Sequence, residues 1–143
     1  MQERRDSVRK SAVAHKERGN FLFKQGKFEP SVNAYSKAIE LDPADATFYN
    51  NRAAALLKLF RFEEAEADCD RVLHLGKDFN VKALLRRGAA REALKKYMEA
   101  EKDYKHVLQQ EPGNREARIG LQSVRAALEG AGGGMGSADF IGM

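Results

Sequence analysis

The sequence repeats itself at a period of 34 to 35 residues, and this period limits the possible folds more than any other feature. Small residues recur at Gly19, Ala53 and Gly88, with offsets of 34 and then 35. Four more sets keep the same offsets: Tyr35, Cys69 and Tyr104; Ser31, Ala65 and Ala100; Ala38, Val72 and Val107; Phe28, Phe62 and Tyr97. In stacked helical repeats, small residues recur where helices approach closely and aromatic residues where the space between layers is filled. The chain is therefore expected to be an array of helical repeats.

Each repeat has the pattern of two helices joined by a short turn. The predicted helices are residues 11–25 and 28–41, then 46–59 and 62–75, then 81–95 and 97–110, followed by a seventh at 114–129. Gly26 suits the end of the first helix, and Asp45 and Asn80 suit the caps of the helices that follow them. The seventh helix is apolar on one face and polar on the other, which is typical of a helix that caps the last repeat.

The predicted fold is all-α: a right-handed α-solenoid of three helix-turn-helix repeats with a C-terminal capping helix. The repeats are expected at about 12–45, 46–80 and 81–113, with the capping helix at 114–129. Residues 1–11 form a charged N-terminal extension that frays or lengthens the first helix. Residues 130–143 are rich in glycine and indicate a flexible linker and tail. Three interpretations of that tail stay open: it belongs to the native chain, it derives from an expression vector, or it is a peptide that docks on another molecule.

Composition narrows the classes of protein further. The net charge of +4 is too mild to indicate nucleic-acid binding by itself, and no apolar run reaches the ~20 residues needed to span a bilayer. One cysteine excludes an internal disulfide framework and suits the cytoplasm, with the nucleus possible. The three histidines are scattered and lie near no cysteine at metal-binding spacing, so no metal is expected. The sequence has no phosphate-binding loop, nucleophile elbow or paired catalytic carboxylates, which predicts a protein that is not an enzyme and needs no cofactor.

Five hydrogen-bond donors fall near the starts of the first helices of the repeats: Lys16, Asn20, Asn51, Lys82 and Arg86. Lys16 and Asn20 are spaced i, i+4, and so are Lys82 and Arg86, so each pair shares a helix face. Lys16, Asn51 and Arg86 are 35 residues apart and are expected to stand side by side on the surface that the repeats share. These positions include no acidic residue, which predicts a site for a carboxylate at the end of a peptide.

Further along the same helix faces the residues become smaller or apolar. Phe23, Ala54 and Leu57 are expected to hold an apolar side chain upstream of the peptide terminus, and Lys58 to meet an upstream glutamate. Because ordering an extended peptide costs much of the gross binding energy, we expect micromolar affinity.

The two-helix period and the small and aromatic positions over residues 12–113, with the cap to residue 129, resemble the tetratricopeptide repeat. The five donors resemble the carboxylate-clamp subclass of that family, which has Lys and Asn in the first repeat, Asn in the second, and Lys and Arg in the third. The resemblance implies an adaptor, or co-chaperone, that binds the C-terminal Glu-Glu-Val-Asp tails of heat shock protein 90 or heat shock protein 70. Residues 23–27 and 86–91 are most similar to adaptors that link chaperones to complex assembly.

Other interpretations of the same residues stay open. The chain is alternatively a general scaffold that assembles complexes through a surface other than the clamp. A basic arm of Arg4, Arg5, Arg9 and Lys10 offers a route to nucleic acid, although solvation is its ordinary role. Asn20 and Asn51 are alternatively structural amides. Cys69 occupies a position held by tyrosine in the other repeats, so it is expected in the core, and the protein is expected to be a monomer.

Overall fold

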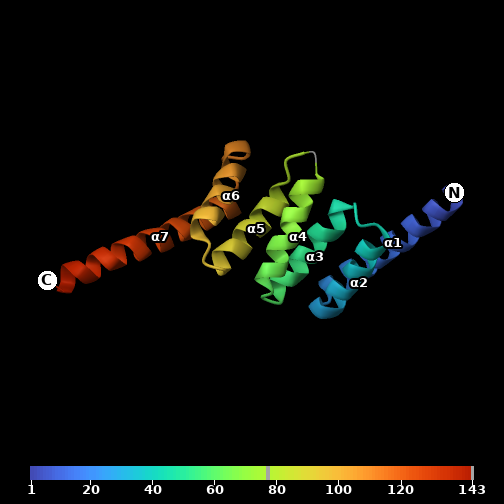
Figure 1. Cartoon of the computed structure of the whole chain (residues 1–143), viewed down its shortest axis with the longest axis horizontal. Coiled ribbons are helices and arrows are strands. Elements are labelled where there is room, and N and C mark those ends of the chain that lie inside the picture. The colour runs from blue at the N-terminus through green and yellow to red at the C-terminus, as the bar shows by residue number, and fades with distance from the viewer. Residues whose placement is uncertain (77, 143) are drawn as a thin grey trace.

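The chain forms an elongated array of helices. The computed structural model describes residues 1–76 and 78–142, with side chains described up to residue 130. Its helices are α1 (Gln2–Lys24), α2 (Phe28–Leu41), α3 (Ala46–Lys58), α4 (Phe62–Leu75), α5 (Val81–Ala93), α6 (Tyr97–Gln110) and α7 (Arg115–Gly142). They follow one another along the long axis, and the termini lie at opposite ends (Figure 1). The predicted all-α fold is confirmed, since these residues contain no strand.

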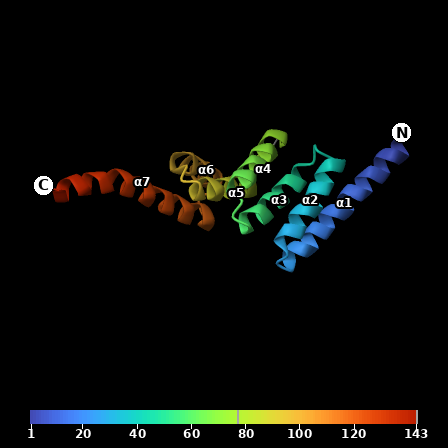
Figure 2. The same ribbon diagram turned by 60° about the horizontal axis from the view of Figure 1, so that its bottom comes forward.

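Packing between the helices gives the array two unequal sides. Helices α1 and α2 pack together, as do α3 and α4, and α5 and α6, while α7 covers α6. Between repeats, α1 contacts α3, α3 contacts α5, and α5 contacts α7, but within the described part of the chain α2, α4 and α6 do not contact one another. The odd-numbered helices therefore form the closer, inner side of the solenoid. Figure 2 shows the same succession of helices from a second direction.

Inside each repeat, the side chain on the second helix matches the size of the residue it faces on the first. The facing positions are Gly19 and Tyr35, Ala53 and Cys69, and Gly88 and Tyr104. A Cβ atom added at Gly19 would lie 2.5 Å from Cε1 of Tyr35, so the ring takes the space that a side chain would need. In the second repeat the smaller Cys69 leaves room for the methyl group of Ala53. Cys69 is fully buried, and burial raises the pKa of its thiol to about 12, which confirms the predicted core position.

The helix ends follow local chemistry. The bounds of α2, α4 and α6 agree with the predicted ranges, and α3 and α5 differ from them only at their C-terminal ends. Asp45 Oδ1 accepts a hydrogen bond from the backbone N of Thr47 at 2.9 Å, and Asn80 Oδ1 accepts one from Ala83 N at 2.9 Å. Both residues are therefore N-caps, as predicted. Gly26 adopts a φ of 77°, which suits a turn after α1.

The charged N-terminal extension lengthens α1, which begins at Gln2 rather than near residue 11. Arg9 in this extension donates from Nη1 to Asp42 Oδ2 at 2.9 Å and to Asp45 Oδ2 at 2.6 Å. Its guanidinium also lies 5.5 Å from the ring centroid of Phe48. One cation of the basic arm is thus engaged by the protein itself, which weakens the nucleic-acid interpretation.

Helix α7 differs from the prediction at its C-terminal end. The sequence predicts that the helix ends at residue 129 and that a linker follows from residue 130, whereas α7 continues to Gly142. Once a helix has formed, each further residue adds one hydrogen bond, and glycine weakens this extension without blocking it. No proline follows Pro112 to stop the helix. The side chains of the predicted tail from residue 131 lie outside the described residues.

Across the described residues, none of the helices has both the length and the apolar character that crossing a bilayer requires.

Candidate functional site

The inner side of the solenoid carries a groove made of two adjoining hollows. The first, of about 220 Å³, is lined by Asn20, Phe23, Lys24, Tyr35, Asn51, Ala54 and Arg86. The second, of about 560 Å³, is lined by Phe23, Ala54, Leu57, Lys58, Phe60 and Arg86. Because Phe23, Ala54 and Arg86 belong to both, the hollows are continuous. We call these two hollows together the inner groove; it is polar at one end and apolar at the other.

At the polar end, two asparagines and a tyrosine form a small network. Tyr35 Oη donates to Asn20 Oδ1 at 2.5 Å, and Asn51 Nδ2 donates to the same oxygen at 3.2 Å. Burial raises the pKa of Tyr35, so its hydroxyl keeps the proton that it donates. Since Asn20 Oδ1 accepts both bonds, the Asn20 amide group is left to donate from Nδ2. The network therefore orients a donor at the polar end of the groove, and the two asparagines bond to each other rather than to the backbone.

Arg86 lines both hollows of the inner groove and is held from one side. Its Nη1 donates to the backbone oxygen of Asn50 at 2.9 Å and to Asn50 Oδ1 at 2.7 Å. Burial lowers the pKa of the Arg86 guanidinium, because the charge loses water without gaining a carboxylate. Its Nε and Nη2 groups have no hydrogen-bond partner among the described residues. An arginine fixed in this way can present two parallel N–H groups to an incoming carboxylate.

The two predicted lysines lie outside the lining of the hollows. Lys16 and Lys82 each come four residues before a lining residue, Asn20 and Arg86, and so lie one turn towards the helix N-terminus. Lys82 is exposed and Lys16 is half-buried. Neither ammonium group lies within 4.0 Å of a carboxylate in the described residues, in contrast to arginines elsewhere such as Arg91. Both lysines can therefore face an anion at the polar end of the groove.

The repeat register corrects one expectation about these donors. The offsets of 34 and 35 pair Glu17, and not Lys16, with Asn51 and Arg86. Lys16 comes one residue earlier, which is about 100° around the helix. The predicted side-by-side alignment of Lys16, Asn51 and Arg86 is therefore wrong in detail: Asn51 and Arg86 meet at the inner groove, with Asn20 as their neighbour from α1.

All the remaining predicted residues line the inner groove. Phe23, Ala54 and Leu57 form its apolar part, and Lys58 lies at the rim beside them. Ala54 faces both hollows, where a small side chain leaves room for a ligand.

Several residues of the site were missed from the sequence. The repeat pattern predicts only a space-filling role for Tyr35, yet its hydroxyl orients Asn20. Asn50 anchors Arg86 through two hydrogen bonds. Nothing in the sequence indicates this role except that Asn50 is next to Asn51. Phe60 had a visible signal: it occupies the turn position that Gly26 holds one repeat earlier.

Phe60 is an exposed aromatic residue in a strained backbone conformation. Its φ is 59°, the residue is 77% exposed, and it lines the apolar end of the inner groove. A left-handed conformation costs a non-glycine residue about 1–2 kcal/mol. The ring of Phe60 packs against that of Phe62, with 5.9 Å between the centroids, and the rest of the ring is open to the groove, where a ligand can contact it.

We therefore expect Phe60→Gly to stabilise the domain while weakening its binding. Removing the strain should raise the free energy of unfolding by about 0.5–1 kcal/mol, after the greater freedom of glycine in the unfolded chain is subtracted. Urea unfolding measures this change, and peptide titration should show an affinity several-fold lower. Lys95 has a φ of 64° at the equivalent turn of the next repeat, so Lys95→Gly is the matched control, which should stabilise without affecting binding. A loss of stability in Phe60→Gly would contradict the argument.

Comparison with known proteins places this geometry in a family. A family profile described as "TPR repeat" matches residues 19–59, and a second, described as "Tetratricopeptide repeat", matches residues 46–77. Human RNA polymerase II-associated protein 3 is 44% identical over 117 residues, which are 82% of this chain. The match spans only 17% of that relative.

Two solved structures are similar over nearly their whole length. The first TPR of Spaghetti (RPAP3), bound to HSP90 peptide SRMEEVD, is 42% identical, with 84% of this chain and 94% of that chain covered and a TM-score of 0.80. The second TPR domain of the human RPAP3 protein, in complex with HSP70 peptide SGPTIEEVD, is 41% identical, with 82% of this chain and 98% of that chain covered and a TM-score of 0.77. Both of these bound peptides end in the same four residues.

Proposed function

Because the chain belongs to the tetratricopeptide repeat family, we propose that it is a non-enzymatic adaptor module that binds the C-terminal tail of heat shock protein 90 or heat shock protein 70. The terminal aspartate of the tail, with its two carboxylates, would lie at the polar end of the inner groove. Lys16, Asn20, Asn51, Lys82 and Arg86 would donate to it. The single buried cysteine suits a reducing compartment, so we place this function in the cytoplasm or nucleus.

One observation carries the proposal: Arg86 in the inner groove, and Lys16 and Lys82 one helical turn before its lining residues Asn20 and Arg86, are cations that the protein does not neutralise. Lys16, Lys82 and Arg86 form no ion pair with the described residues, whereas the other inter-helix arginines of α3 and α5, such as Arg52, are paired with buried aspartates. Leaving a half-buried cation without a counter-ion is costly, and an incoming carboxylate relieves that cost.

The apolar end of the groove supports the same orientation of the peptide. Leu57 and Phe60 line only the second hollow, Asn20 lines only the first, and Phe23 and Arg86 line both. A tail whose last carboxylate meets Arg86 would place its upstream residues over these side chains. The upstream residues of the peptides bound by the two similar structures include Met and Ile, respectively, which fits an apolar hollow.

Titration calorimetry with two versions of one peptide tests this proposal. A peptide that ends in Glu-Glu-Val-Asp with a free C-terminus is expected to bind with micromolar affinity, and raising the salt concentration should weaken it. The same peptide with an amidated C-terminus loses one carboxylate and should bind at least about tenfold more weakly. Equal affinity for the two versions would contradict recognition of the terminus.

The runner-up function is a scaffold that assembles complexes through another surface. It would leave the inner groove unused, so neither form of the tail peptide would bind in that case. Titrating the tails of both chaperone classes side by side then separates the two functions and shows which chaperone is preferred.

A further inference from the structure

A second cationic pocket lies between α1 and α2, apart from the inner groove. Comparison of the three repeats shows that this pocket lacks an acidic residue that the other two repeats have. In the second repeat, Arg52 on α3 donates from Nε to Asp68 Oδ2 at 2.8 Å and from Nη2 to Asp68 Oδ1 at 2.7 Å. In the third, Arg87 on α5 makes the same fork with Asp103, at 3.0 and 2.7 Å. Each fork joins the two helices of its repeat.

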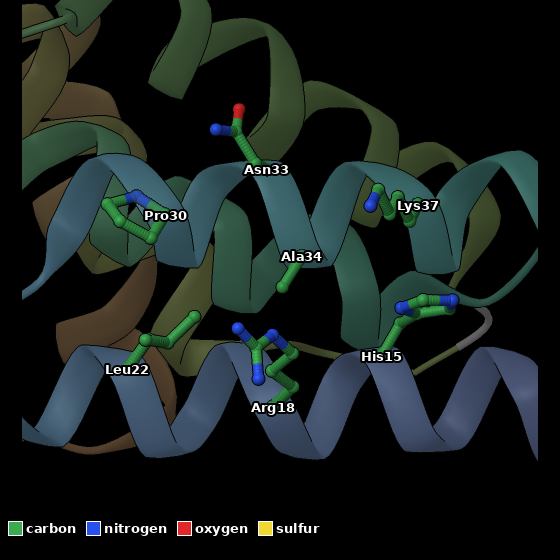
Figure 3. A pocket seen from close by; sticks show the side chains of 7 residues that line it. All are labelled: His15, Arg18, Leu22, Pro30, Asn33, Ala34 and Lys37. Atoms are coloured by element: carbon green, nitrogen blue, oxygen red, sulfur yellow. The ribbon is translucent and has the colours of Figure 1, made fainter.

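In the first repeat the arginine is present and the aspartate is absent. The offsets of 34 and 35 pair Arg18 with Arg52 and Arg87, and they pair Ala34 with Asp68 and Asp103. Within the described part of the chain, Arg18 forms no ion pair or hydrogen bond. A hollow of about 210 Å³ remains beside Ala34. The guanidinium of Arg18 points from α1 towards Ala34 on α2, where the missing carboxylate would have been (Figure 3).

Arg18 also lacks the second partner that the later arginines have. Arg52 Nη1 donates to Ser36 Oγ at 3.1 Å, and Arg87 Nη1 donates to Asp70 Oδ1 at 3.0 Å, and in both cases the acceptor belongs to the preceding repeat. Among the described residues, none takes this second position beside Arg18. The side-chain N–H groups of Arg18 therefore have no partner within the described part of the chain.

Two further basic side chains line the same hollow. Lys37 on α2 and His15 on α1 line the hollow together with Arg18, and the lining includes no acidic residue. The rest of the lining consists of the apolar residues Leu22, Pro30 and Ala34 and the amide Asn33. A small hollow with an arginine, a lysine and an apolar floor suits a single carboxylate on a short side chain.

This pocket faces a different direction from the inner groove. His15, Arg18 and Leu22 are spaced i, i+3, i+7 on one face of α1. Asn20, which lines the inner groove, lies two residues after Arg18 and so about 200° around the helix. A ligand in one site therefore leaves the other accessible.

We propose that the pocket between α1 and α2 binds an aspartate or glutamate side chain from an acidic segment of a partner protein, which takes the place of the aspartate missing at position 34. The partner is an acidic stretch of chain and needs no free C-terminus. The observed forks indicate a carboxylate, because this arginine position holds a planar carboxylate in both other repeats.

The test uses an acidic peptide that cannot enter the proposed carboxylate clamp. An N-acetylated, C-amidated peptide of alternating Asp and Gly residues is titrated into the ¹⁵N-labelled protein. We expect the largest shifts at the amides of Arg18, Ala34 and Lys37, and binding that weakens as salt is added. Arg18→Gln, which keeps a polar side chain with N–H donors but removes the charge, should weaken binding about tenfold. Arg86→Ala should leave this binding unchanged, which separates it from the proposed tail binding.

Ala34→Asp is the most direct variant. It supplies the missing carboxylate within the chain, so it should abolish binding of the acidic peptide while maintaining or raising the melting temperature. Unchanged binding in Arg18→Gln or in Ala34→Asp would overturn the proposal, as would shifts confined to the inner groove. Markedly tighter binding of a matched phosphoserine peptide would also overturn it, because the pocket would then be a phosphate site. If the Ala34→Asp variant fails to fold, the titration of the Arg18→Gln variant still tests the proposal.

Discussion

Replacing Arg86 with alanine is expected to weaken binding of the free chaperone tail by about a hundredfold, which corresponds to about 2.8 kcal/mol. Arg86 lines both hollows of the inner groove, and it is the only one of the three proposed clamp cations that lines them. Because Asn50 already holds one side of its guanidinium, little further ordering is needed when a carboxylate binds. Two charge-assisted hydrogen bonds of about 1.5–3 kcal/mol each, partly offset by desolvation, account for this magnitude.

Arg125→Ala is a suitable control for this variant. Arg125 is also an arginine, but it is exposed on α7, pairs with Glu101 on α6, and does not line the inner groove. Its replacement should leave affinity within about twofold of the original protein, since exposed ion pairs contribute little. Lys82→Glu should match the loss in Arg86→Ala, because it places a negative charge next to the carboxylate. Binding of the tail by Arg86→Ala at the original affinity, with an unchanged melting temperature, would exclude Arg86 from the site.

Much of this architecture could be predicted because the period of the sequence reports directly on packing. Tyr35 and Gly19 are complementary in size, and the same positions recur in each repeat, so helix pairing followed from spacing alone. The turn after α1 ends in Gly26, and Asp45 and Asn80 cap the helices that follow. In each case a local property of the residue determines the structure, without information from distant parts of the chain.

The details that escaped prediction depend on which atoms meet once the helices are stacked. The spacing predicts that Asn20 lies near Asn51, but it does not predict that the hydroxyl of Tyr35 completes their hydrogen-bond network. The spacing also does not predict that Asn50, rather than an acidic neighbour, accepts the hydrogen bonds of Arg86. These bonds join residues far apart in sequence, and their partners are set by side-chain rotamers and burial. The length of α7 was missed because a glycine-rich composition lowers helix propensity without forbidding a helix.

Replacing Asp103 with alanine should be among the most destabilising single changes in the domain. Asp103 is 2% exposed and accepts hydrogen bonds from Arg87 at 3.0 and 2.7 Å and from Arg91 at 3.1 Å. The variant leaves two largely buried guanidinium groups without this carboxylate. Removing one partner of a buried ion pair costs about 3–5 kcal/mol, which is a large part of the about 5–15 kcal/mol that stabilises a typical domain. Urea denaturation followed by circular dichroism measures the loss.

Asp70→Ala is the matched control, because Asp70 also accepts a bond from Arg87, at 3.0 Å, but its side chain is 53% exposed. It should cost no more than about 1 kcal/mol. Equal losses for Asp103→Ala and Asp70→Ala would show that burial does not determine the effect. The double variant Asp103→Ala with Arg87→Met should recover part of the stability, since the cost arises from a stranded charge rather than from the missing bond itself. The first repeat follows the same rule: Ala34 is tolerated opposite Arg18 because that arginine is exposed and keeps its water.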